Sequence, residues 1–191
     1  MFGRKEKAAV AALPAQHRAL AVEQVLSVAQ TPAQWDELFA SLTKHEQLVR
    51  KHPLPPRVRD VVVPLVRALS EDVEPDGIIG ATIDLRGPEA RGKLHPGRQL
   101  PAIAPVTRIE EQIAWDPWLV LRVGLRHGAQ LDLNVTDTVR IQELRKRSRS
   151  GKTKFKTKRK ANQRIAVTLK TAKGAVVTPP PPSPATGWLR M

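Results

Sequence analysis

Residues 131–169, LDLNVTDTVRIQELRKRSRSGKTKFKTKRKANQRIAVTL, decide the fold of the β part of this chain. The sequence Arg149-Ser150-Gly151 in its middle is typical of a three-residue hairpin loop with the glycine in the left-handed conformation. That loop would place three apolar pairs opposite each other: Leu131 with Leu169, Leu133 with Val167, and Val135 with Ile165. A slip of one residue would divide these side chains between the two faces. The turn and the apolar pattern therefore predict the same long antiparallel hairpin.

The predicted register also sorts the charged side chains of the hairpin by face. Alternate residues of one strand project from the same face, about 6.6 Å apart. One face then carries Lys152, Lys154, Lys156, Lys158 and Lys160, together with Arg140 and Lys146 of the other strand. The opposite face carries Arg145, Arg147, Arg159 and Phe155. We therefore expect one row of lysines whose spacing suits a row of phosphates.

Like charges face each other in this register. Lys146 falls opposite Lys154, and Arg140 falls opposite Lys160, an arrangement that destabilises a β-ladder. The ribbon itself, residues 144–162, contains no acidic residue that would offset them. We therefore predict a two-stranded basic ribbon that protrudes from the sheet and takes its counter-charge from a partner.

The rest of the chain is electrically neutral. Of the formal net charge of +14, residues 145–164 supply eleven positive charges and residues 165–191 supply three, with no acid in either segment. Residues 1–76 and residues 77–144 each hold equal numbers of acidic and basic residues. A uniformly basic composition would spread the excess along the chain, so this concentration indicates a local function.

Alternating apolar residues predict a small antiparallel β-domain over residues 77–177. Besides the two sides of the hairpin, strands are expected at residues 79–85, 106–115 and 119–125. Asp116-Pro117 is predicted as a corner between two of them, and His127-Gly128 as a turn. Residues 86–105, rich in glycine and proline, are predicted as a long loop.

Residues 1–76 are predicted as a helical region. Apolar residues at helical spacing indicate helices over residues 15–29, 32–51 and 57–70. The second of these begins with a capping-box pattern, Thr31 and Gln34, and with Pro32 at its first position. An acidic linker follows at residues 71–76, and residues 178–191 form a proline-rich tail that we expect to be disordered. The predicted fold class is α+β, with a helical region followed by an antiparallel meander.

No residue pattern indicates catalysis, a cofactor or a metal site. The chain has no cysteine, and its five histidines lack metal-ligand spacing. We interpret the carboxylates as turn and surface groups: Glu110, Glu111, Asp116, Asp132 and Asp137. Trp115 and Trp118 bracket the predicted corner and are interpreted as core residues. We therefore expect a protein that is not an enzyme and has no small-molecule substrate.

The basic ribbon predicts a surface that binds a polyanion, most economically the phosphate backbone of nucleic acid without strong sequence specificity. The residues expected to bind are Arg140, Arg145, Lys146, Arg147, Arg149, Lys152, Lys154, Phe155, Lys156, Lys158, Arg159, Lys160 and Arg164. Neither DNA nor RNA is favoured. Sequence-specific reading of a single strand is not expected, because ring stacking normally uses several aromatic side chains and the ribbon has only Phe155.

Three alternatives fit the same residues. The basic segment could be a solvated loop, could contact an anionic membrane surface, or could bind a protein with an acidic surface. In an envelope-associated adaptor, the helical face of Trp35 and Phe39 would bind a protein partner while the ribbon tethers the assembly. No apolar run is long enough to cross a bilayer, and the lack of cysteine fits a reducing compartment. We therefore expect a cytoplasmic location.

Overall fold

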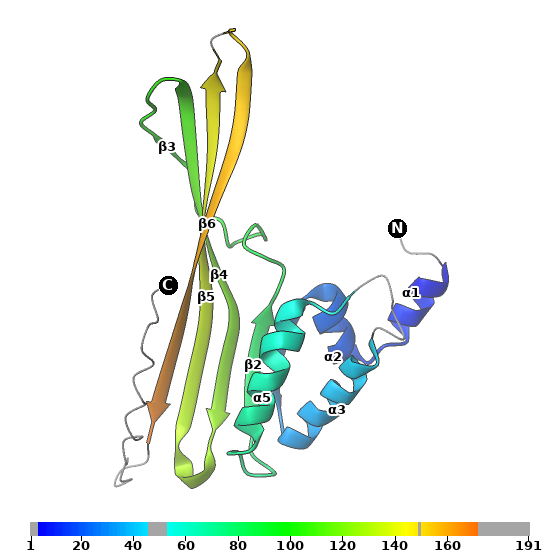
Figure 1. Cartoon of the computed structure of the whole chain (residues 1–191). Coiled ribbons are helices and arrows are strands. Elements are labelled where there is room, and N and C mark those ends of the chain that lie inside the picture. Colours follow the sequence, from blue (N-terminus) through cyan, green and yellow to red (C-terminus); the bar gives the residue numbers. More distant parts are fainter. Residues whose placement is uncertain (1–3, 46–52, 149, 172–191) are drawn as a thin grey trace, which may run out of the picture.

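A computed structural model describes residues 4–45, 53–148 and 150–171 of the chain. Within them the fold is α+β and mostly sheet, with six antiparallel strands and several short helices (Figure 1). The proline-rich tail predicted for residues 178–191, the apolar run at residues 175–177 and Arg149 lie outside the described residues. Among the described helices, none combines the length and the apolar character that a bilayer crossing requires.

The sheet has the strand order β1-β2-β4-β5-β6, and a short strand β3 pairs with β4. Its strands are β1 (Val25–Gln30), β2 (Ile79–Asp84), β3 (Arg98–Leu100), β4 (Val106–Gly124), β5 (Gln130–Arg147) and β6 (Thr153–Lys170). The long hairpin predicted from the sequence is β5–β6, and its register is the predicted one from Gln130 opposite Lys170 to Arg147 opposite Thr153. Gly151 has φ +78°, the left-handed conformation that the loop requires.

The helices are short, and among the described residues all but the 3-10 turn η3 lie in the first half of the chain. They are α1 (Arg4–Ala11), α2 (Ala15–Arg18), α3 (Pro32–Thr43) and α5 (Val63–Ser70), with π-helical turns η1 (Ala19–Glu23) and η2 (Val58–Val62) and a 3-10 turn η3 (Arg126–Gly128). Helix α3 begins as predicted, because Thr31 and Gln34 cap each other's backbone groups and Pro32 needs no hydrogen-bond donor there. Residues 46–51, the end predicted for this helix, lie outside the described residues.

The predicted helix over residues 15–29 is wrong in its second half. Gln24 adopts a left-handed backbone with φ 59° and ends the helical turns. Val25–Gln30 then forms β1, which pairs antiparallel with β2. A short apolar run rich in valine is compatible with the spacing of a helix and with that of a strand. Here the run forms a strand because it pairs with β2.

The larger of two hydrophobic clusters lies between the helices and the lower half of the sheet, and the smaller one consists of Ala114, Val139 and Ile141. We define the lower half as β1, β2, Trp115–Gly124 of β4, Gln130–Val139 of β5 and Ala161–Lys170 of β6. Trp35 and Phe39 of α3 are buried in the larger cluster, and Trp35 Nε1 donates to the Ile79 carbonyl oxygen at 3.2 Å. Core residues come from both sides of the acidic segment 71–76, and β1 belongs to the same sheet as β2. The core therefore joins the N-terminal region to the sheet.

The predicted corner at Asp116-Pro117 is also wrong. β4 continues through it for 19 residues, and the register with β5 shifts by a bulge between Pro117 and Leu119. A bulge accommodates a proline, which has no N–H for the ladder. β4 therefore accompanies β5 as far as Val106, opposite Lys146. The ribbon is not two-stranded: its basic hairpin is the outer part of a sheet that β4 and β3 extend (Figure 1).

Candidate polyanion-binding face

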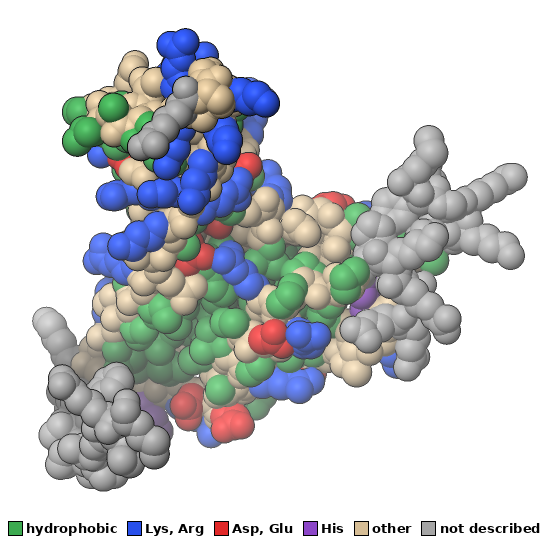
Figure 2. Space-filling view, turned by 45° about the horizontal axis from the view of Figure 1, so that its top comes forward, with side chains coloured by type: hydrophobic (Ala, Val, Ile, Leu, Met, Phe, Trp, Pro, Cys, Tyr) green, Lys and Arg blue, Asp and Glu red, His purple; other side chains and the backbone are tan. Residues whose placement is uncertain are grey.

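The register places the lysines on the face of the sheet away from the helices. On β5, Leu133 and Val135 point into the core, so residues at the alternate positions point the other way. We call that surface, with Lys154, Lys156, Lys158 and Lys160 of β6 and Arg140 and Lys146 of β5, the lysine face. Arg164 lies on the same face further along β6, and Lys152 lies in the turn before β6. Figure 2 shows Lys and Arg side chains gathered on this projecting end of the molecule.

The opposite face of the hairpin carries the remaining predicted residues. Arg145 and Phe155 are cross-strand partners there, and Arg147 and Arg159 occupy the same side of the strands. Phe155 is 79% exposed and faces away from the lysine row. Of the thirteen predicted residues, Arg149 lies outside the described residues, Lys152 lies in the turn, and the other eleven divide between two faces of the sheet.

Two of the predicted cations are already paired with acids of the protein. Arg140 lies 3.4 Å from Glu111 of β4, which also accepts hydrogen bonds from Arg98 at 2.6 Å and from Gln142 at 2.8 Å. The hydrogen bond from Arg98 holds the pKa of Glu111 below its usual range. Arg159 forms an ion pair with Glu89 of the loop before β3. The ribbon itself contains no acidic residue, as the sequence shows, but β4 and the loop before β3 bring carboxylates beside it at these two positions.

Most of the predicted cations have no such partner. Among the described residues, no carboxylate lies within ion-pair distance of Arg145, Lys146, Arg147, Lys152, Lys154, Lys156, Lys158, Lys160 or Arg164. All of them except Lys146 are exposed. Lys146 lies directly opposite Lys154, as predicted. The lysine face therefore keeps an uncompensated positive charge close to solvent.

Several carboxylates that were interpreted as surface groups are buried instead. Asp116 is fully buried, and Lys93 Nζ approaches its Oδ1 at 2.6 Å. Asp137, its cross-strand partner, forms an ion pair with Arg57 and accepts a hydrogen bond from Gln163 at 3.0 Å. This network lies at the border between the helix-covered lower half of the sheet and its basic upper end.

The two tryptophans of the predicted corner separate. Trp118 is buried, with the Arg57 guanidinium 4.5 Å from its ring centroid. Trp115 is 58% exposed and lies in one cross-strand row with Thr138 and Asn162, on the lysine face. The interpretation as core residues therefore holds for Trp118 and is wrong for Trp115. The signal in the sequence that could have shown this is the period of two along residues 109–115, which places Trp115 on the same face as Glu111.

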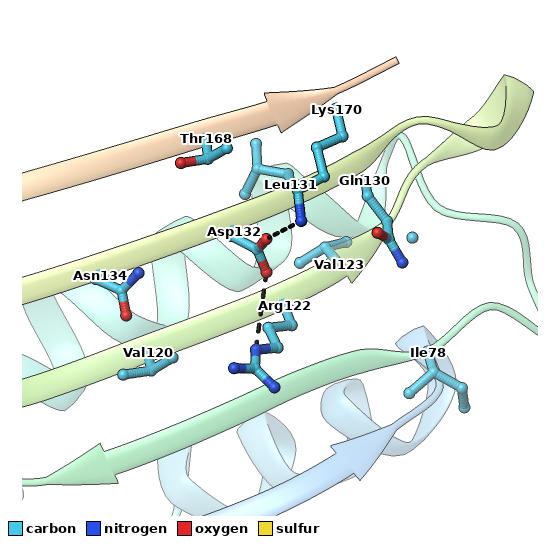
Figure 3. Close-up of a pocket in the computed structure, with 11 residues that line it drawn as sticks. Ile78, Val120, Arg122, Val123, Gln130, Leu131, Asp132, Asn134, Thr168 and Lys170 are labelled. Atoms are coloured by element: carbon cyan, nitrogen blue, oxygen red, sulfur yellow. Dashed lines mark ion pairs between the residues drawn. The ribbon is translucent and has the colours of Figure 1, made fainter. Parts of the chain in front are cut away.

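A polar hollow lies on the lower half of the same face (Figure 3). Its volume is about 670 Å³, and Asp132 lies at its centre between Lys170 at 3.5 Å and Arg122 at 3.8 Å. Asn134 and Thr168 line it beside them. Asp132 offsets one of the two positive charges, so this trio keeps a net charge of +1. We find no group of metal-ligating side chains within the described part of the chain.

Comparison with family models, with curated proteins and with solved structures finds no match to this chain. The function is therefore argued from the geometry and charge of the lysine face.

Proposed function

We propose that this protein is a non-enzymatic binding protein whose lysine face contacts the phosphate backbone of nucleic acid, without strong sequence specificity. The observation that carries the proposal is the exposed lysine row of β6, which has no carboxylate partner among the described residues. Lysine ammonium groups on one strand face recur every ~6.6 Å, and phosphates are the recurring anions of a nucleic acid.

Binding of this kind has a thermodynamic signature. Each neutralised phosphate releases condensed counterions, so the logarithm of the affinity falls linearly with the logarithm of salt concentration. Contact with ~6 phosphates gives a slope of about −5. The lysine face offers that number of cations when Lys146 and Arg164 are counted with the row of β6.

The test is fluorescence anisotropy of labelled duplex DNA, hairpin RNA and polyglutamate, titrated at several salt concentrations. A variant of the lysine face, Lys154→Gln with Lys156→Gln and Lys158→Gln, should bind nucleic acid at least about tenfold more weakly and flatten the salt slope by two to three, roughly one for each lost contact. The matched control replaces three cations of the opposite face, Arg145, Arg147 and Arg159, with Gln and should change the binding much less.

Three outcomes would contradict the proposal. Binding that is insensitive to salt between ~50 and ~200 mM excludes a phosphate-contact mechanism. Equal affinity for polyglutamate and nucleic acid would indicate only a sticky cationic surface. Equal losses in the two triple variants would show that the lysine face has no special part in binding.

A second candidate function, an adaptor for a protein partner at an anionic surface, has a different observation in its favour. Trp35 and Phe39 were expected to bind the partner, but both are buried in the core and present no surface to it. Instead, Ile165, Val167 and Leu169 of the edge strand β6 are more than half exposed, on the face opposite the lysines. An edge strand with apolar side chains accepts an added strand. Co-sedimentation with anionic vesicles, without binding to duplex DNA, would favour this function.

A further inference from the structure

Trp115 is an exposed aromatic ring at the lower border of the lysine face, next to the row of Arg140 and Lys160. It projects from β4 in the cross-strand row of Thr138 and Asn162, and more than half of its surface is accessible. Large aromatic side chains are normally placed to bury their area, so an accessible tryptophan on a charged face is an unusual feature of a small domain. Its ring plane offers an apolar surface among cations.

The ring also borders a hollow of about 320 Å³. Pro117 and Gly92 line the hollow together with the basic side chains Arg86, Arg91 and His95. This volume lies within the range of sites that hold small ligands or single ring systems. The hollow is thus a shallow site with an aromatic side and basic side chains around it.

The basic side chains around the hollow differ in whether they are paired with a carboxylate of the protein. Asp84 accepts hydrogen bonds from Arg86 at 3.0 and 2.8 Å, and Lys93 lies between Asp84 and the buried Asp116. The Arg86 hydrogen bonds are the main reason that the pKa of Asp84 lies well below its usual range. For the exposed Arg91, in contrast, no carboxylate partner is found in the described parts of the chain. Arg91 is therefore the cation of the hollow that remains available to a phosphate.

The hollow and the lysine row lie within the reach of one short nucleotide segment. β4 and β6 are two strand spacings apart, about 10 Å, and Lys160 precedes Asn162 by two residues on β6. The Cα atoms of Trp115 and Lys160 are then about 12 Å apart. A backbone that follows the lysines can therefore place a neighbouring base at Trp115.

We infer that the lysine face binds single-stranded nucleic acid, with one unpaired base stacked on Trp115 and its phosphate beside Arg91. This inference rests on the proposed function and specifies its ligand. Bases in a duplex cover each other's faces, so only an unstacked base offers its ring to a side chain. Stacking on an aromatic ring tolerates any base, which agrees with the absence of strong sequence specificity. Trp115 supplies a stacking ring on the lysine face, where the ribbon itself, with Phe155 on the opposite face, has none.

The test compares a labelled single-stranded oligonucleotide of mixed sequence with the duplex of the same sequence at constant salt. Trp115→Leu should weaken single-strand binding about tenfold or more and leave duplex binding within a factor of two. Trp115→Phe keeps a stacking ring and should retain most of the affinity. Phe155→Leu is the matched control, because Phe155 is the other exposed aromatic ring of this region and lies on the opposite face. Arg91→Gln should flatten the salt slope for the single strand by about one.

The outcomes separate this inference from the proposed function. If Trp115→Leu and Arg91→Gln bind the single strand as tightly as the wild type, stacking is refuted while backbone binding stands. Binding to duplex but not to single strands likewise overturns the inference alone. If the wild-type protein binds neither nucleic acid, both fall. Melting curves establish that each variant is folded. If Trp115→Leu does not fold, the Arg91→Gln and Trp115→Phe variants still test the inference.

Discussion

The β5–β6 hairpin passes through two environments with one unbroken register. In its lower half, β5 packs through Leu133 and Val135 into the core that the helices cover. In its upper half, Arg140–Arg147 and Thr153–Lys160, the side chains of β6 are exposed and mostly cationic. The same backbone ladder is thus used once to bury apolar surface and once to present charge. Stability and binding are expected to respond to substitutions in different halves.

Ion pairs that involve buried carboxylates lie at the border between the two halves. Asp116 with Lys93, and Asp137 with Arg57, lie where the apolar core ends and the cationic surface begins. Removing one partner of a buried ion pair leaves a charge without compensation, which is costly. The network therefore fixes β4 and β5 at the point where the helices no longer cover them.

The largest predicted effect sharpens the comparison within the lower half, through two leucines on the same face of the sheet, of which only one is buried. Leu121 of β4 is fully buried, whereas Leu169 of β6 is 53% exposed. Leu121→Ala should lower the free energy of unfolding by about 3–5 kcal/mol, since it removes packed methyl groups and leaves a cavity. Leu169→Ala should lower it by less than about 1 kcal/mol. Denaturant titrations measure both, and equal losses would show that β6 is covered as well as β4.

A smaller effect sharpens the comparison by acting on the helical layer alone. His17 is buried between Ser41 at 2.7 Å and His45 at 2.8 Å. Burial, with the neighbouring His45, lowers the pKa of His17 to about 4. As the pH decreases from 6.5 to 4, His17 becomes protonated in the unfolded chain but stays neutral in the folded protein. The free energy of unfolding therefore decreases by about 2–3 kcal/mol over this range and changes little below it.

The measurement is a series of unfolding titrations from pH 7.5 to pH 4. His17→Gln keeps a polar group at the site and should flatten the curve in that window. The exposed His95, changed to Gln, serves as the control and should leave the curve as in the wild type. An unchanged pH dependence in His17→Gln would assign the effect to other groups.

The smallest predicted effect lies in the upper half. Lys154 opposes Lys146, whereas Lys156 opposes Leu144. Lys154→Gln relieves a like-charge pair and should raise the melting temperature by about 1 °C at low salt. Lys156→Gln should raise it less. The contrast should vanish at ~1 M salt, because charge interactions are screened there. A difference that persists at high salt would point to packing instead of charge.

The sequence by itself determined the features that depend on neighbours along the chain. The alternation of apolar residues and the Arg149-Ser150-Gly151 loop predicted the hairpin register, and with it which lysines share a face. Thr31, Pro32 and Gln34 predicted where α3 begins. Each of these follows from backbone geometry and local hydrogen bonding, which act over a few residues.

Tertiary structure alone decided which surfaces are covered. β4 continues past Pro117 because its long pairing with β5 tolerates one bulge, and no local pattern reports that partner. The same pairing leaves Trp115 exposed beside the lysines and buries Trp118 under Arg57. It also brings Glu111 to Arg140 and leaves Ile165, Val167 and Leu169 at an edge. The spacing of apolar residues along the sequence predicts which side chains share a face. What lies against that face is determined only by packing between segments that are distant in the sequence.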